Sequence, residues 1–498
     1  MIPITTIPFL LVIALACFLK PRLRVLALGG LMAFTDAAII VEPVALSVSW
    51  VAFIALLCSS FLPDLGAMRR RALTLAGILV IGLCAYDLVA ILLTGAFFTH
   101  QFIAMPNTAL FKISLASAVE LVPAHFNQFV YLCLGALVTI AVPASMDRRG
   151  PAASIEFVEN LLIGFTLTAS FIAFWQFASY NAPIPYPSDF IHSGARVEIA
   201  DAGQGVGGAR RIFGPFQEPS TLGNLVGQAV CFLLARPLTQ KPALLRFVTI
   251  GAGLIALLIS TSTTALAAVG LAAVILPLSF IARPFFALTR RSEAATFASS
   301  RFSDGIVLFT VGSLTILFSM YLLSQPHTMT VLNTILFEKD RSNSFIERSY
   351  SNIVAKDIFT ETYGLGIGFG GHVASNLFLT VAACGGFVGL ICFGYFFVMG
   401  LLCPLGPIKS SMKAASFAER TALVDGRIAI SCMLAGCFVV NALSGANVNN
   451  QFLWFAFGTA AYFFSPSLTP LTKVRSARKS KKRLLLGRAP YPGRAVIR

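Results

Sequence analysis

Residues 210–220 of this otherwise apolar chain carry residue types that bind phosphate and accept protons. The segment reads Arg-Arg-Ile-Phe-Gly-Pro-Phe-Gln-Glu-Pro-Ser and contains Arg210, Arg211 and Glu218. The planar donors of arginine bind phosphate oxygens in a bidentate manner, although two arginines also fit simple anchoring at a membrane surface. Glu218 fits two roles equally: a carboxylate that accepts a proton from a hydroxyl, or a favourable charge at a helix N-terminus whose first residue is Pro219.

Residues 341–376 form a second polar segment with a comparable set of side chains. Ser344 and Glu347 have the spacing of a capping box, which predicts a structural role for Glu347 and a helix that starts near Phe345. Arg341 and Arg348 flank this helix start, where the helix dipole disfavours a cation but favours a bound anion. A diphosphate between the two arginines would resolve this conflict, and weak pairing with acidic neighbours is the alternative. The expected apolar stripe of the helix is Ile346, Tyr350, Ile353 and Ile358.

The end of the second segment combines a glycine-rich run, 364–371, with three polar side chains: His372, Ser375 and Asn376. No strand-helix unit surrounds the glycines, which excludes a nucleotide-binding loop. The run either lets backbone approach a ligand or makes a tight return to the membrane. His372 and Asn376 are four residues apart, so an early helix start would place both on one cleft. His372 is then a candidate general base, and a polar cap is the alternative.

The composition decides which kind of element positions these residues. The chain is 57% hydrophobic and only 12% charged, with a mean hydropathy of +0.81, whereas soluble domains are roughly 25% charged. We therefore predict an all-α, polytopic integral membrane protein with about twelve to fourteen transmembrane helices. The apolar runs are 3–19, 25–41, 46–62, 72–98, 127–144, 160–180, 221–236, 247–262, 263–283, 304–324, 376–403, 427–443 and 449–465.

Basic residues between the apolar runs predict the orientation. Most fall on alternate loops, which the preference of Lys and Arg for the cytoplasmic side places inside the cell. Residues 1–465 then form a membrane domain, and 466–498 form a basic cytoplasmic tail that is attracted to anionic lipid rather than to nucleic acid. The loops 181–219 and 325–375 lie on the extracytoplasmic side, and we expect the second to be partly helical. The site they form is predicted to face the extracytoplasmic side of the membrane.

Other polar residues are assigned structural roles. Asp36 and Asp87 lie in apolar runs without an evident partner, and no basic residue is expected inside the membrane, which argues against a proton-coupled transporter. The run 260–264 is expected to bend its helices through bonds to its own backbone, with a lipid-phosphate groove as the alternative. The cysteines show no metal-ligand or redox spacing.

The order of these features resembles the bacterial O-antigen ligase and polysaccharide polymerase superfamily. The resemblance is carried by Arg211-x-x-Gly-x-x-x-Glu-Pro-Ser220, the Ser/Thr-rich break at 260–264, and Glu347-Arg348 followed by the glycine run. It continues through Ser375-Asn376-Leu-Phe-Leu and Gly385-Gly-Phe-Val-Gly389, so it covers roughly residues 205–395. Each motif is loose, and the ordered set is moderately specific.

The resemblance implies an inverting membrane glycosyltransferase whose donor is an undecaprenyl-diphosphate-linked oligosaccharide. Arg211, Arg341 and Arg348, with Arg210 beside them, would bind the diphosphate, and Glu218 and His372 compete to activate the acceptor. The resemblance implies no metal and no nucleotide sugar, and we expect no cofactor. A chain-length regulator and an export machinery are the expected protein partners.

One departure from the family pattern favours a polymerase of repeat units over a ligase. Ligases typically carry a histidine directly before the asparagine of the last outer motif, whereas this chain has Ser375 there and His372 three residues earlier. A ligase that transfers finished glycan to a lipid A core or another acceptor is the first alternative. A flippase or exporter without chemistry is the second, and a pure scaffold would leave the arginines of the two loops unexplained.

Overall fold

The computed structural model describes most of the membrane domain. The described residues are 6–40, 46–60, 65–98, 102–104, 117–193, 205–206, 209–236, 243–272, 274–275, 343–405, 417–443 and 449–464. The apolar run 304–324, Arg341 and the basic tail 466–498 lie outside them.

Helices account for nearly all of the described chain. They are α1 (Thr6–Cys17), α2 (Pro21–Leu31), α3 (Val48–Ser60), α4 (Leu65–Ala72), α5 (Leu75–Leu93) continued by the π-helical turn η1 (Thr94–Phe98), α6 (Pro123–Arg149), α7 (Pro151–Asn181), α8 (Ser188–Ile191), α10 (Pro219–Leu234), α11 (Ala243–Ile259), a short helix Thr263–Ala272, α15 (Asn343–Glu361), α16 (Leu377–Leu401), the 3-10 turn η4 (Cys403–Leu405), α18 (Phe417–Leu443) and α19 (Gln451–Phe464). Three two-stranded antiparallel hairpins join β1 (Ala38–Ile40) to β2 (Leu46–Ser47), β3 (Ile103–Ala104) to β4 (Ser117–Ala118), and β5 (Gly205–Val206) to β6 (Ala209–Arg210).

The helices confirm the predicted fold class, an all-α, multi-pass membrane protein. Within the described residues, 5 helices are long and apolar enough to cross a bilayer: Leu75–Phe98, Pro123–Arg149, Pro151–Asn181, Leu377–Leu401 and Glu419–Leu443. Shorter apolar helices include Thr6–Cys17, Val48–Ser59, Pro219–Leu234 and Leu244–Ile259. One predicted span is wrong, because α2 ends at Leu31 and the rest of the run 25–41 turns into β1.

Close backbone approach holds the bundle together. Helix α2 packs along α7, α19 along α6, and α10 along α18. At the first of these contacts a Cβ on Gly164 would lie 2.1 Å from the carbonyl oxygen of Leu26, and one on Gly29 would lie 2.5 Å from that of Leu161. Only glycine allows the two helices to approach this closely, as is common where helices pack inside a membrane.

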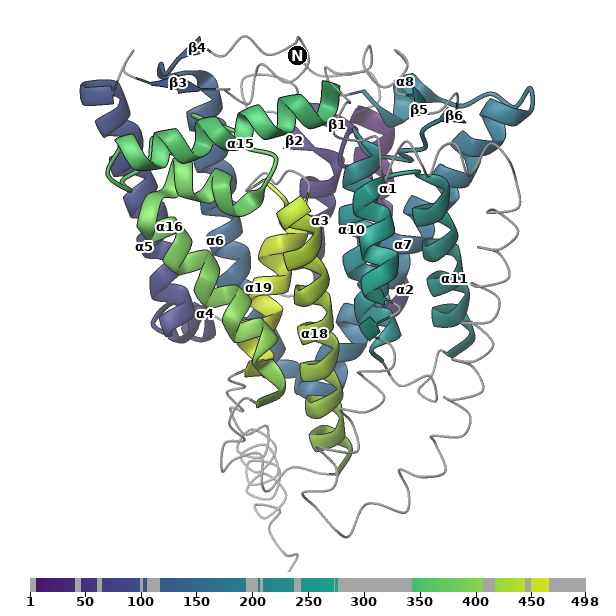
Figure 1. Ribbon diagram of the computed structural model, residues 1–498. Coiled ribbons are helices and arrows are strands. Elements are labelled where there is room, and N and C mark those ends of the chain that lie inside the picture. The colour runs from purple at the N-terminus through teal and green to yellow at the C-terminus, as the bar shows by residue number, and fades with distance from the viewer. Residues whose placement is uncertain are drawn as a thin grey trace, which may run out of the picture.

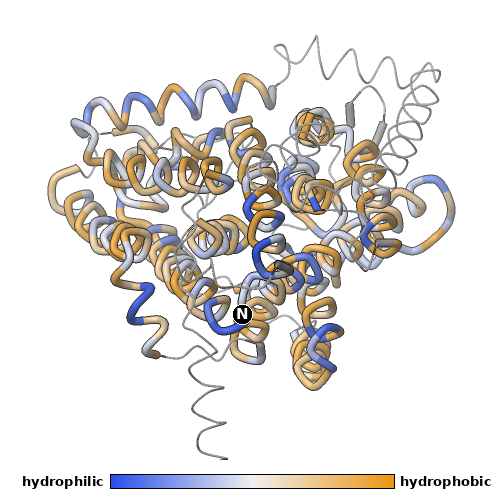
Figure 2. The backbone as a smooth tube through the Cα atoms, turned by 90° about the horizontal axis from the view of Figure 1, so that it is seen from below, coloured by the Kyte–Doolittle hydropathy of each residue, from blue (hydrophilic) through white to orange (hydrophobic). Residues whose placement is uncertain are grey.

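Helix α15 and the small hairpins gather at one end of the bundle, which we call the α15 end (Figure 1). Helix α15 lies across the ends of the long helices, and it packs against α16 and β3. Helix α8 and the hairpins β1/β2 and β5/β6 lie at the same end. Seen from the opposite end, most of the helical backbone is coloured as hydrophobic (Figure 2).

Buried ion pairs gather at the opposite end, which we call the α4 end. Arg71 of α4 donates from Nε to Asp147 of α6 at 2.7 Å. Glu159 of α7 accepts from Arg236 at 3.1 Å and from Arg246 of α11 at 2.6 Å. Arg246 is fully buried among these helices. A buried guanidinium is tolerated here because a carboxylate compensates its charge.

Candidate functional site

The segment between β6 and α10, residues 211–218, is fixed by its apolar side chains. Ile212, Phe213 and Phe216 are buried in the bundle. Gly214 makes the turn with φ +59°, in the left-handed region that favours glycine. Because these four residues fix the backbone, the segment holds the two polar residues at its ends, Arg211 and Glu218, in defined positions at the α15 end.

Arg211 lies in an environment that is unfavourable for a cation. Burial lowers the pKa of its guanidinium, and the positive charge of Arg348 lowers it further, whereas the carboxylate of Glu218 raises it. The buried Nε of Arg211 has no hydrogen-bond partner among the described residues. An anion near Arg211 and Arg348 would supply both the missing acceptor and the missing negative charge.

The three residues Arg211, Glu218 and Arg348 therefore form one charged cluster, to which α15 contributes Arg348. Two segments that are far apart in the sequence are joined here. Arg210 ends strand β6 and directly precedes Arg211. The predicted ligand Arg341 lies outside the described residues.

Glu218 occupies the N-cap position of α10, and Pro219 is the first helical residue, as predicted. Its side chain, however, makes no capping hydrogen bond to the helix. The carboxylate instead accepts a hydrogen bond from the hydroxyl of Ser220 at 2.7 Å. An ionised carboxylate accepts several hydrogen bonds, so Glu218 can accept from a second donor as well.

Helix α15 differs from its predicted register. It begins at Asn343, so Ser344 lies inside the helix, and the predicted capping box with Glu347 is wrong in its position. The exposed Glu347 lies in the second turn. The predicted apolar stripe is also wrong except at one residue: Ile346, Tyr350 and Ile353 are exposed, and Ile358 is buried. The buried face contains Ser351, Val354, Ala355 and Ile358. This face packs on the loop before α16 as well as on apolar helices.

His372 ties the loop before α16 to α15. Its imidazole is buried, and Nε2 lies 2.9 Å from the carbonyl oxygen of Ser351. Burial lowers the pKa of His372 to about 4, and the hydrogen bond to Ser351 only partly opposes this. Because a carbonyl can only accept, Nε2 carries a proton and donates it. This geometry suits a packing role better than that of a base.

Ser375 and Asn376 complete the same connection. The Ser375 hydroxyl lies 3.2 Å from that of Ser351, and its backbone N–H donates to Asn352 at 3.1 Å. Asn376 is the N-cap of α16, where its side chain accepts from the N–H of Phe378 at 2.8 Å. The early helix start that would have placed His372 and Asn376 on one cleft does not occur, because α16 begins only at Leu377.

The glycine run 364–371 returns tightly into the bundle, and its backbone bonds to the protein. Gly386 has φ +57° and breaks the helical conformation of α16. Ala383 and Cys384 thereby accept hydrogen bonds from the N–H groups of Ile367 and Gly368, both at 3.0 Å. On the other side, the N–H of Phe369 donates to Asp87 of α5 at 2.7 Å. Asp87 is thus not without a partner, and these three N–H groups are not available to a ligand.

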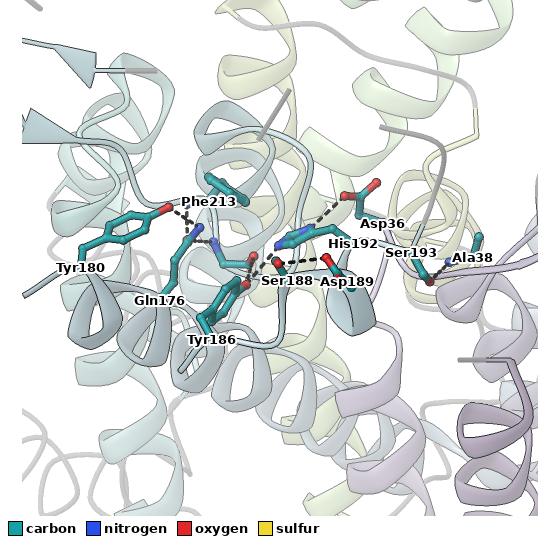
Figure 3. Close-up of polar contacts among 11 residues, drawn as sticks. Asp36, Ala38, Gln176, Tyr180, Tyr186, Ser188, Asp189, His192, Ser193 and Phe213 are labelled. Atoms are coloured by element: carbon teal, nitrogen blue, oxygen red, sulfur yellow. Dashed lines mark hydrogen bonds and ion pairs between the residues drawn. The ribbon is translucent and has the colours of Figure 1, made fainter. Parts of the chain in front are cut away.

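A buried polar network beneath residues 211–218 was missed in the sequence (Figure 3). Asp36 was expected to lack a partner, but its carboxylate lies 2.8 Å from Nδ1 of His192. Nε2 of the same ring lies 3.1 Å from the hydroxyl of Tyr186, which donates to the carbonyl oxygen of Gly214 at 3.1 Å.

No protein-family model matches this chain, and no curated protein matches it either. The resemblance to the ligase and polymerase superfamily is therefore carried by the order of motifs alone.

Proposed function

We propose that this protein is a membrane glycosyltransferase that polymerises undecaprenyl-diphosphate-linked oligosaccharide repeat units at the outer face of a bacterial inner membrane. One observation carries the proposal: a partly buried arginine whose Nε lacks an acceptor lies beside a second arginine and a carboxylate, in the two segments whose motifs resemble the superfamily. In this proposal the α15 end faces the periplasm and the α4 end faces the cytoplasm.

The charged cluster fits the charges that change in an inverting transfer. The acceptor hydroxyl oxygen forms a bond to the anomeric carbon of the donor sugar, and the bond from that carbon to the diphosphate oxygen breaks. The hydroxyl proton passes to the carboxylate of Glu218, which acts as the general base. The departing diphosphate takes the bonding electron pair, and the guanidinium groups of Arg211 and Arg348 stabilise its growing negative charge.

The buried contacts explain how such a site would be held in place. Residues 211–218 are fixed by three buried apolar side chains, and α15 is joined to α16 through Ser351, His372 and Ser375. Preorganised charges of this kind lower a barrier without reorganising during the reaction. The sugar hydroxyl and the diphosphate would lie on opposite sides of the anomeric carbon, as inversion requires.

The decisive experiment is an assay of the purified protein in lipid nanodiscs with a lipid-diphosphate-linked repeat unit as the only glycan. A ladder of products that remain attached to the lipid is the expected result. A parallel reaction with preformed polymer on the carrier and lipid A core as acceptor tests for a ligase. Transfer only in that second reaction would replace the polymerase with the ligase, and no covalent product in either would contradict a glycosyltransferase.

A further inference from the structure

The Asp36–His192–Tyr186 network (Figure 3) ends on the backbone of residues 211–218, between the two charged residues of the site. The side chains of His192 and Asp36 are only 1% and 4% exposed, so water contributes little to their bonding. Asp36 comes from the turn after α2, Tyr186 from the loop after α7, and His192 from the end of α8. Of the three, Tyr186 is the residue that hydrogen-bonds to the segment, at the carbonyl oxygen of Gly214.

The positions of the protons in this network follow from its acceptors. The Gly214 carbonyl has no proton, so the Tyr186 hydroxyl must donate its only one. The Tyr186 oxygen can then only accept, which requires a proton on Nε2 of His192. The short contact between Nδ1 and Asp36 needs one more proton, shared between that nitrogen and the carboxylate. His192 and Asp36 together therefore hold two protons when Tyr186 bonds to Gly214.

Removing one of these protons changes the direction of the chain. A neutral imidazole beside an ionised Asp36 keeps its proton on Nδ1, because a bare nitrogen facing a carboxylate is repulsive. Nε2 then becomes an acceptor and takes the hydrogen bond of the Tyr186 hydroxyl. The Gly214 carbonyl loses its donor, and a buried carbonyl without a partner is costly.

Other contacts couple this bond to the rest of residues 211–218. Gln176 of α7 accepts hydrogen bonds from the backbone N–H groups of Phe213 at 3.0 Å and Gly214 at 2.9 Å. The ring of Phe213 lies 5.1 Å from that of His192. Burial raises the pKa of Tyr186, so its hydroxyl remains a donor. Gly214 is thus held by hydrogen bonds at both its N–H and its carbonyl oxygen.

We propose that Asp36, His192 and Tyr186 are positioning residues for the charged cluster, and that the proton shared by Asp36 and His192 keeps Arg211 and Glu218 in their binding geometry. The inference rests on the proposed function for the identity of the ligand, a lipid-linked diphosphate. Loss of the proton would release Gly214 and weaken binding of the diphosphate, without any of the three residues touching it.

The remaining groups around His192 do not replace this proton. On the described elements that contact His192 and Tyr186, the other titratable or charged side chains include Tyr180 at the end of α7, which acts on Tyr186, Asp189 on α8 itself, and Arg211 and Glu218 of the segment 211–218. Asp189 accepts from Ser188 in an exposed pair. Asp36 is thus the acid that pairs with His192.

The test measures binding of geranyl diphosphate by the full-length protein in detergent over a series of pH values. Tyr186→Phe removes the hydroxyl that connects His192 to Gly214, and Tyr395→Phe, in the C-terminal half of α16, is the control. At low pH we expect Tyr186→Phe to bind about fivefold more weakly than the wild type, the effect of one ordinary hydrogen bond. At high pH the ratio should approach one. The ratio of the two affinities cancels titration of the ligand. A ratio that does not change with pH, or equal affinities of the two proteins at every pH, would overturn the inference.

A second variant keeps the test valid if Tyr186→Phe does not fold. In His192→Gln the amide nitrogen can donate to Tyr186 at every pH, so binding should lose the decline that the wild type shows as pH rises. An unchanged decline would contradict the relay. Arg348→Ala separates the two proposals: if it binds geranyl diphosphate normally, the diphosphate site itself is wrong, and if it binds weakly while both relay variants behave like the wild type, only the relay is wrong.

Discussion

Arg211, just before α10, lies close enough to Arg348 of α15 for the second guanidinium to lower the pKa of the first. Two partly buried like charges repel each other, and Glu218 offsets only part of this repulsion. Such an arrangement lowers the stability of the folded protein unless an anion binds between the charges. Removing one arginine therefore distinguishes a ligand site from a structural ion pair. In a ligand site the ligand-free protein is not destabilised by the removal, whereas in a structural ion pair it is.

Arg348→Ala should not destabilise the ligand-free protein, and it should remove its stabilisation by diphosphate. A ligand at a hundredfold excess over its Kd stabilises a protein by about 2.7 kcal/mol, and losing a charged hydrogen bond weakens binding roughly ten- to a hundredfold. Thermal unfolding in detergent, with and without geranyl diphosphate, measures both effects. Lys356→Ala, an exposed lysine of the same helix, is the matched control. A lower Tm of ligand-free Arg348→Ala with an unchanged ligand shift would indicate a structural arginine.

Glu218→Gln tests the general base. The amide keeps an oxygen that accepts from Ser220 but cannot take a proton, so turnover should fall by about a hundredfold or more. The Kd for the donor should change little, because glutamine has nearly the same shape. Glu361→Gln, at an exposed position of α15, controls for loss of an acidic residue. Equal losses of binding and turnover would instead place Glu218 in donor recognition.

His372 makes the stability of the protein depend on pH. Its pKa is lowered from 6.5 to about 4 in the folded protein, so below pH 6.5 the unfolded chain binds a proton that the folded protein does not. The stabilisation is complete above pH 6.5 and is lost as the pH falls toward 4, by about 3 kcal/mol in total. Unfolding measured at several pH values should show this loss in the wild type.

The variant His372→Gln separates the structural role from a catalytic one. Its amide nitrogen can still donate to the carbonyl of Ser351, so the protein should fold. Its stability should fall less than that of the wild type through this pH range, and the remaining decline includes that of His125, whose pKa burial also lowers. Turnover near neutral pH should be retained within about threefold if Glu218 is the base. A loss of turnover with normal donor binding would return the catalytic role to His372.

The sequence was sufficient for the fold class and for the two segments that form the charged cluster. Long apolar runs dictate helices, which satisfy their own backbone hydrogen bonds in a membrane. This signal does not depend on tertiary contacts. The amphipathic reading of α15 failed for the opposite reason. Its buried face includes Ser351, which faces a polar loop, whereas its exposed face carries Ile346 and Ile353.

Pairings between distant residues could not be predicted. Asp36 lies at the end of an apolar run and His192 in a loop, and nothing in their spacing marks them as partners. The same holds for Asp87, whose partner is a backbone N–H of the glycine run. A lone intramembrane acid was a sound signal of a special site, since its burial requires compensation, but the compensating group becomes visible only once the chain is folded.

Two glycines of α16 offer a matched test of how the glycine run is held. A Cβ on Gly386, at φ +57°, would lie 2.3 Å from the carbonyl oxygen of Gly364, whereas one on Gly394 would meet no atom within 4 Å. Gly386→Ala should therefore displace the run and remove the bonds of Ile367 and Gly368 to α16, lowering stability by about 2 kcal/mol or more. Gly394→Ala should stabilise the helix by up to about 1 kcal/mol. Thermal unfolding of the two variants, with amide exchange over residues 364–371, measures the difference. Equal stabilities with unchanged exchange would show that the break in α16 does not hold the run.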